Sequence, residues 1–120
     1  MPYSETFRDH LANPRNTGEV DSPEASAELT NPVCGDRLRL TLRVASGRVE
    51  AARFLAYGCA PTIACGSALT QLVTGRTVAD CLALERRDLT RAVGGLPPRK
   101  QHAAALALET LRAALEGFRD

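Results

Sequence analysis

The chain has 120 residues, of which 44% are hydrophobic and 24% charged, and its formal net charge is +1 at pH 7. This length suits one domain, and a charge so close to neutral gives no sign of a nucleic-acid or membrane partner. The chain has no Trp, two Tyr and three Phe, so it also lacks the aromatic side chains on which nucleic-acid bases stack.

The first ten residues, MPYSETFRDH, contain no apolar run of the kind that marks a secretory signal, and no later run reaches membrane-spanning length. We therefore expect a cytoplasmic protein whose thiols stay reduced. Its four cysteines are then expected to be metal ligands, reactive thiols or small core residues rather than disulfides: Cys34, Cys59, Cys65 and Cys81.

Apolar residues recur at helical spacing over 3–12 and predict a short helix that Ser4 caps and that ends before Pro14. The segment 15–28 is rich in Asn, Gly, Ser, Pro and acids, which indicates a loop. This loop is expected to lead into a short edge strand near 25–30.

Strict alternation of apolar and polar residues over 37–44 predicts a strand with one buried face and one basic face. Ser46 and Gly47 indicate a tight turn, after which 49–56 returns as the partner strand. The row of arginines on the polar face is either a docking surface or, as is more usual, the solvated face of a one-sided sheet.

The hydrophobic period changes after Ala60 and predicts a helix followed by shorter ones. Thr77 and Asp88 are expected to cap two short helices, and Pro97 and Pro98 open the last helix. The fold class is therefore α+β: a small antiparallel sheet of about three strands packed against several helices. The apolar stripe of the first of these helices comprises Cys65, Ala68, Leu69, Leu72 and Val73.

Groups that bind metals lie at three junctions between loops and regular elements. Cys34 and Asp36 enter the first strong strand, Cys59 stands where a helix begins, and His102 lies in the first turns of the last helix. Two thiolates, a carboxylate and an imidazole are enough for a four-coordinate metal. No CxxC or HExxH spacing supports the site independently.

Cys65 lies six residues after Cys59, and six residues of helix span about 9 Å and turn through about 600°. The two thiols would therefore point in different directions, which favours a core or supporting position for Cys65 over ligation. Two other roles stay open for Cys65, an additional ligand and an acceptor of sulfur held on Cys59. Cys81 lies on an apolar stripe and is expected in the core.

Four phrases of the sequence, YSETFRDHLANPRNTGEV, NPVCGD, ARFLAYGC and LPPRKQHAAALA, occur in this order along nearly the whole chain. Together they resemble the U-type iron–sulfur cluster assembly scaffolds, the IscU/NifU N-terminal family. The resemblance implies one IscU-like α+β domain over 1–120, with no enzymatic activity. It also implies a scaffold that receives sulfur from a cysteine desulfurase and passes a transient cluster, of the 2Fe–2S type, to recipient apo-proteins.

The resemblance assigns metal ligation to the residues that match the family's motifs: Cys34, Asp36, Cys59 and His102. The segment Leu96–Pro97–Pro98–Arg99–Lys100 is similar to the LPPVK segment that an Hsp70-type chaperone recognises, with Arg99 in place of the valine. The family's third cysteine directly follows the histidine, and this chain has Ala103 there.

Three functions remain open from the sequence. The first is a scaffold that assembles or carries a labile iron–sulfur cluster, or iron, with zinc able to occupy the same site. The second is a sulfur carrier, in which Cys59 accepts persulfide sulfur and no cluster forms. The third is a zinc-stabilised, non-catalytic partner protein that has lost scaffold activity with the third cysteine. The retained motifs favour the first, and Ala103 favours the other two.

Overall fold

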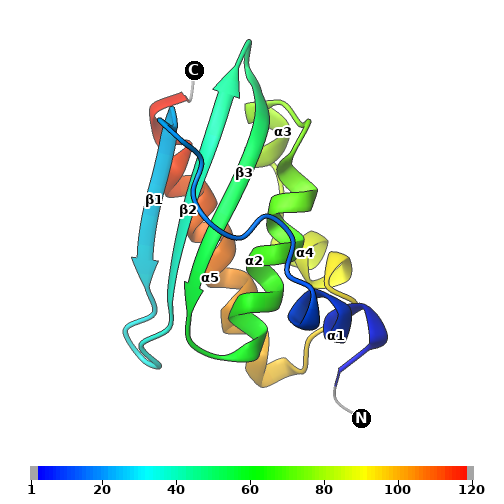
Figure 1. Cartoon of the computed structure of the whole chain (residues 1–120). Helices are drawn as coiled ribbons and strands as arrows, with labels where there is room; N and C mark the ends of the chain where they lie inside the picture. Colours follow the sequence, from blue (N-terminus) through cyan, green and yellow to red (C-terminus); the bar gives the residue numbers. More distant parts are fainter. Residues whose placement is uncertain (1–2, 119–120) are drawn as a thin grey trace.

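The structure is a computed structural model that describes residues 3–118 (Figure 1). No helix in this range combines the length and the apolar composition that crossing a membrane requires. Two short 3₁₀ turns, η1 (Pro98–Lys100) and η2 (Glu116–Phe118), flank the last helix. In chain order the other elements are α1 (Glu5–Ala12), β1 (Ala25–Thr30), β2 (Arg37–Ala45), β3 (Arg48–Tyr57), α2 (Ala60–Val73), α3 (Val78–Leu82), α4 (Arg86–Ala92) and α5 (Gln101–Ala114).

The three strands form one antiparallel sheet in the order β1-β2-β3, with α2 and α5 packed on one of its faces (Figure 1). The alternation in β2 places its leucines on the helix-covered face, and Leu40 pairs with Ala27 on one side and Phe54 on the other. The predicted α+β class, the three strands and the long helices are confirmed.

A β-bulge changes the register of the β2–β3 hairpin near its turn. Val44 pairs with Val49, but Arg43 pairs with Ala51, so β3 contributes one extra residue. At the far end of the hairpin this register pairs Arg37 with Tyr57. The residues just beyond this last pair, at the same end of the sheet, belong to the site described below.

The core lies between the sheet and the two long helices, where Phe54 is 1% exposed. Gly66 of α2 faces this ring, and a Cβ added there would lie 2.5 Å from the Phe54 Cδ2 atom. The absence of a side chain at Gly66 therefore allows α2 to pack closely on β3. Other side chains that are fully buried in this core include Leu38, Leu40, Leu42, Leu69 and Leu111.

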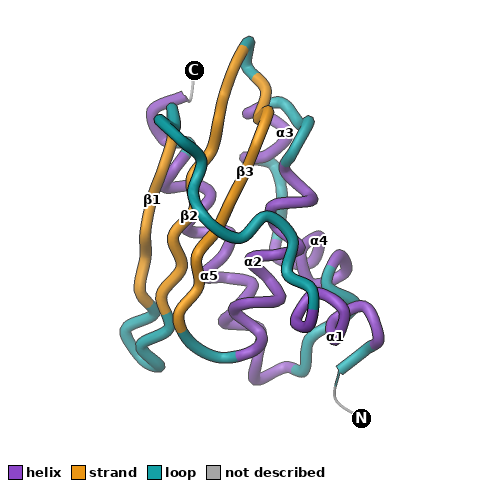
Figure 2. The backbone as a smooth tube through the Cα atoms, viewed as in Figure 1, coloured by secondary structure: helices purple, strands orange, loops and turns teal. Residues whose placement is uncertain are grey.

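The segment 13–24, here called the strap, crosses the other face of the sheet (Figure 2). Its backbone pairs with β3 where Phe54 N donates to Asn16 O and Gly18 N donates to Phe54 O, both at 2.9 Å. Val20 N then donates to the Thr41 hydroxyl in the middle of the face, also at 2.9 Å. Thr41 is consequently 1% exposed.

The basic face of β2 is therefore only partly solvated, which corrects the expectation of an open polar face. The Arg39 guanidinium forms an ion pair with Glu19 of the strap at 3.0 Å, and Arg43 donates to the Asp21 carbonyl oxygen at 2.8 Å. These contacts attach the strap to the sheet through the arginines that the sequence had marked as a free surface.

Helix α1 is joined to α2 through a buried hydrogen bond between His10 Nδ1 and the Ser67 hydroxyl, 2.7 Å long. Burial lowers the pKa of His10, and the nearby Arg15 guanidinium lowers it further. The imidazole in this contact is therefore neutral near neutral pH. The hydroxyl of Ser67 also accepts from the Arg15 backbone N–H at 2.9 Å, which fixes the start of the strap.

Most of the predicted helix ends are confirmed. Ser4 and Thr77 cap α1 and α3 through their side-chain oxygens. The prediction for Asp88 was wrong: Glu85 is the N-cap of α4, and Asp88 lies three residues on, where its carboxylate accepts from the Glu85 N–H at 2.8 Å. This reciprocal arrangement is a capping box, which moves the helix start upstream of the acid.

Candidate metal centre

The loop between β1 and β2 places Cys34 and Asp36 at one end of the sheet. Asn31 organises this loop, since its side-chain oxygen accepts from the Cys34 N–H and its carbonyl accepts from the Gly35 N–H. Gly35 has a φ of +80°, a conformation that glycine adopts without strain. Cys34 is exposed, whereas Asp36, directly before β2, is buried.

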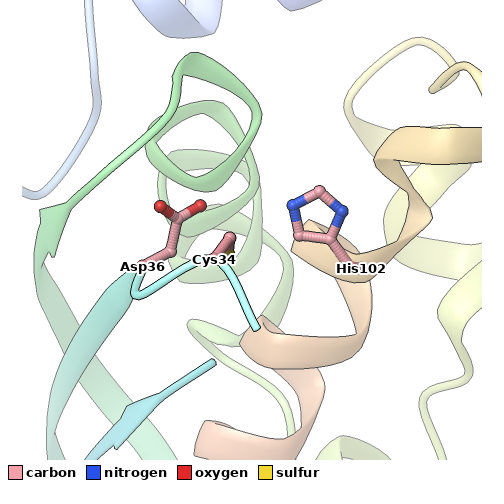
Figure 3. Close-up of side chains that lie close together, drawn as sticks. All are labelled: Cys34, Asp36 and His102. Atoms are coloured by element: carbon pink, nitrogen blue, oxygen red, sulfur yellow. The ribbon is translucent and has the colours of Figure 1, made fainter. Parts of the chain in front are cut away.

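His102 approaches the same place from the other layer of the fold, as the second residue of α5. Figure 3 shows its imidazole facing the loop that carries Cys34 and Asp36. One donor atom from each of these three residues lies within 4.8 Å of the other two. The convergence that the sequence predicted for these three residues is therefore present in the fold.

The imidazole is oriented so that one nitrogen is free for a metal. His102 Nδ1 lies 3.2 Å from the Arg99 carbonyl oxygen, which accepts and never donates. That hydrogen bond requires a proton on Nδ1, so in the neutral form of the ring the lone pair is on Nε2. A backbone partner of this kind is how ligating histidines are commonly held in proteins.

Asp36 is the centre of the hydrogen bonds in the site. Its Oδ2 atom accepts from the Cys59 thiol and from the Thr62 hydroxyl, each at 2.9 Å. Burial alone would raise the pKa of this carboxyl group, but hydrogen bonds from Cys59, Thr62 and Cys34 outweigh burial and lower it. Asp36 is therefore a carboxylate, the form that binds metal.

Gly58 allows β3 to pass close to this carboxylate. Because Arg37 pairs with Tyr57, the next residue on each strand, Asp36 and Gly58, also lie side by side. Gly58 has a φ of +150°, and a Cβ added to it would lie 2.5 Å from the Asp36 Cγ atom. Only glycine fits this position without moving the carboxylate.

Cys59 is the N-cap residue of α2 and joins the site through Asp36 rather than through the close group of three. Cys65 is fully buried, as its place on the apolar stripe predicted, and burial raises the pKa of its thiol to about 12. Cys81 is also in the core. Ala103, beside His102, is 1% exposed and supplies no donor.

The donor set fits a transition metal chemically. Thiolate sulfur and imidazole nitrogen are ligands that zinc and iron accept readily, and a carboxylate completes such sets. The exposed position of Cys34 and the half-buried position of His102 leave one side of the site open to solvent.

Thr62 is the site residue that the sequence did not reveal. It lies at the third position of α2, next to the N-cap residue Cys59, and its hydroxyl is 3.4 Å from the Cys59 sulfur. Side chains at this position turn back toward the N-cap, so the helix start marked by Pro61 was the one available signal.

A family model described as the NifU-like N terminal domain matches residues 2–120. The bifunctional protein NifU/MnmA of Rubrobacter xylanophilus is 46% identical over 118 residues, which are 97% of this chain and 24% of that protein. The iron–sulfur cluster assembly scaffold protein IscU of Escherichia coli is 36% identical over 123 residues, which are 99% of this chain and 95% of that protein.

Solved structures share the fold. A crystal structure of an iron–sulfur cluster assembly scaffold of the SUF system from Fervidobacterium islandicum matches with a TM-score of 0.75 at 18% identity, over 94% of this chain and 96% of that one. The N-terminal part of a NifU-like protein from Brucella abortus matches with a TM-score of 0.74, also at 18% identity, over 94% of this chain and 91% of that one. The resemblance that the motifs indicated is confirmed, and the chain belongs to the NifU-like N-terminal domain family, whose members include the IscU scaffolds.

Proposed function

We propose that residues 1–120 act as one scaffold domain on which an iron–sulfur cluster is assembled or carried before transfer to recipient proteins. The observation that carries the proposal is the convergence of Cys34, Asp36 and His102, whose donor atoms lie within 4.8 Å of one another. The family membership and the scaffold named among its relatives support it. The chain holds and releases a cargo, so it is a scaffold and not an enzyme.

Four residues ligate the cargo in this proposal: Cys34, Asp36, Cys59 and His102. The oxygen and nitrogen donors bind iron less tightly than thiolates would, which suits a transient cluster of the 2Fe–2S type. Cys34 is exposed, and the cargo enters and leaves on its side.

Sulfur reaches the site from a cysteine desulfurase, and recipient apo-proteins take the finished cluster. Cys59 is the acceptor in this scheme, because its half-buried sulfur stands at the N-terminus of α2 and is hydrogen-bonded to the Asp36 carboxylate of the site. The thiolate attacks the outer sulfur of the donor's persulfide, a new S–S bond forms at Cys59, and the donor cysteine leaves as its thiolate. Free thiols that act in this way belong in a reducing compartment, so in this proposal the scaffold works in the cytoplasm.

The segment Leu96–Lys100 is the contact for an Hsp70-type chaperone. Pro98 and Arg99 are exposed, and the remaining residues of the segment are half-buried. The segment ends two residues before His102, so a chaperone bound there would act on the backbone that holds the imidazole, through the Arg99 carbonyl oxygen.

Two other functions use the same residues. The donor set also suits Zn²⁺, which would make the chain a zinc-stabilised partner protein. Because Ala103 is a buried residue without a thiol, the site has two thiols, Cys34 and Cys59. A site with two thiols favours a persulfide carrier in which Cys59 holds sulfur without cluster assembly.

Anaerobic reconstitution separates the three functions. The apo-protein is treated with Fe²⁺, cysteine and a desulfurase, and the visible spectrum, the iron and the acid-labile sulfide are measured. We expect sulfur-to-iron charge-transfer bands and equal amounts of iron and sulfide. Cys34→Ser and His102→Ala should lose most of the cluster, and Cys81→Ala, which removes a buried thiol outside the site, should retain it.

The scaffold proposal fails if the wild-type chain acquires no charge-transfer bands and retains only zinc. Mass spectrometry after desulfurase treatment without iron tests the carrier function. An added sulfur on Cys59 in a chain that builds no cluster would establish the carrier in place of the scaffold.

A further inference from the structure

Thr62 stands between the two groups of the site whose chemistry changes during function. Its hydroxyl oxygen lies 2.9 Å from Asp36 Oδ2 and 3.4 Å from the Cys59 sulfur. The side chain is 1% exposed, and the helix start fixes its position three residues after Cys59. A hydroxyl has one proton to donate, and here the carboxylate receives it.

The other side-chain donors to Asp36 do not persist through function. The Cys59 thiol donates to the same Oδ2 atom, but a thiol that binds a metal or carries a second sulfur no longer has that proton. Cys34 is in the same situation, since it is a ligand in the proposed scaffold. Thr62 neither binds metal nor accepts sulfur, so its hydroxyl keeps its proton. It is the side-chain donor to Asp36 that remains both before and after Cys59 binds metal or carries sulfur.

Apart from the Cys59 backbone N–H, which also donates to this carboxyl group, the orientation of Asp36 depends on the Thr62 hydroxyl. Gly58 lies against the carboxyl group on one side and allows its close approach, but it offers no side chain that could hold the carboxylate. Groups that hydrogen-bond to a ligating carboxylate orient it and commonly change metal affinity by about 10- to 100-fold when they are removed.

We propose that Thr62 is a positioning residue of the metal centre: its hydroxyl donates to Asp36 Oδ2 and holds the carboxylate toward Cys34 and His102. This inference rests on the proposed scaffold function. It adds to the four ligands a residue that touches no cargo and acts through Asp36 alone.

The buried position makes the hydroxyl hard to replace. In a Thr62→Val chain the second methyl group fills the space of the oxygen, so water has no room to enter and serve as donor. Thr62→Ser keeps the donor and removes only a methyl group. The pair of variants therefore separates hydrogen bonding from packing.

The test uses Co²⁺ as the probe, titrated anaerobically into the apo-protein and followed through its absorption bands, with a chelator in competition. Wild type, Thr62→Val and Thr62→Ser are compared. We expect Thr62→Val to bind Co²⁺ about tenfold or more weakly, with d–d bands changed in intensity, and Thr62→Ser to bind as wild type does. Thr110→Val is the matched control, because Thr110 is buried in α5 and its hydroxyl donates to the Leu106 carbonyl oxygen.

Urea unfolding of each apo-protein shows whether the variants are folded, and Thr62→Ala takes the place of Thr62→Val if the latter does not fold. The inference is overturned if the chain without the hydroxyl binds Co²⁺ as tightly as wild type, or more tightly, and equally if Thr62→Ser fails to restore binding. The same titration of Cys34→Ser and His102→Ala tests the proposed function itself. If these two variants bind Co²⁺ as wild type does, the proposed metal centre is wrong, and the role of Thr62 is wrong with it.

Discussion

Gly58→Ala tests whether the close approach of β3 to the site carboxylate is a structural requirement. The new methyl group would lie 2.5 Å from Asp36 Cγ and 2.9 Å from Asp36 Cβ, both well inside van der Waals contact. The carboxyl group is buried and receives hydrogen bonds from α2, so it cannot move aside freely.

Two costs add up in this variant. A non-glycine residue at a φ of +150° is strained by about 1–3 kcal/mol. Forcing an extra methyl group into a packed site costs about another 1–3 kcal/mol. Gly95→Ala isolates the first cost, because Gly95 has a φ of +103° and nothing lies within 4 Å of its added Cβ. We expect Gly58→Ala to lose about 1–3 kcal/mol more stability than Gly95→Ala.

The assay is urea unfolding of the apo-proteins under reducing conditions, with the free energy of unfolding as the readout. Asp36→Ala in the Gly58→Ala chain removes Cγ and both oxygens but leaves the Cβ atom, so it should relieve part of the extra loss. The double variant should therefore lose about 0.5–3 kcal/mol less than the sum of the two single losses. Equal losses in the two glycine variants, with no relief by the second substitution, would refute the reasoning.

Three further outcomes follow from burial. Iodoacetamide should modify the exposed Cys34 well before Cys65, since burial raises the pKa of the Cys65 thiol to about 12; equal labelling rates in a mass-spectrometric time course would contradict this. Burial lowers the pKa of His10 below its ordinary 6.5, so the native state binds fewer protons than the unfolded chain. The stability that this difference contributes is fully present above about pH 6.5 and is lost as the pH falls through the lowered value, and urea unfolding should show a flatter pH dependence for His10→Gln. Thr41→Val leaves the buried Val20 N–H without its acceptor and should cost about 1–3 kcal/mol in the same assay, so an unchanged midpoint would be incompatible with the contact.

Local patterns predicted the elements well because a hydrophobic period reports directly on which face is buried. The alternation over 37–44 identified the inward leucines of β2, and the stripe headed by Cys65 placed that thiol in the core. The prediction that Asp88 is an N-cap failed because an acid at the third position of a helix can also accept a hydrogen bond from the N-cap backbone. Asp88 does this in its capping box with Glu85.

The contacts of Asp36 were beyond the sequence because they depend on register. A hairpin that turns regularly at Ser46–Gly47 would place Tyr57 beside Asp36. The bulge adds one residue to β3, and so Gly58 takes that place and the start of α2 follows it. This single extra residue determines whether Tyr57 or Gly58 lies beside the Asp36 carboxylate. The hydrophobic periodicity of the sequence does not reveal such a bulge.

The strap was the other feature that composition concealed, because a polar segment rich in Gly and Pro reads as an unattached loop. The sequence of the strap showed its resemblance to the family, but it did not predict the path of the strap over the sheet. Pairing with Phe54 and the ion pair to Arg39 make it part of the sheet layer instead.

The strap also bears on self-association. A sheet that ends in an unpaired strand offers its free N–H and C=O groups to a strand from another molecule, and this is a common start of aggregation. In this chain both backbone groups of Phe54, in the middle of β3, already bond to Asn16 and Gly18. A strand from a second molecule could pair with the middle of β3 only after the strap had been displaced. The strap therefore protects that edge of the sheet against self-association.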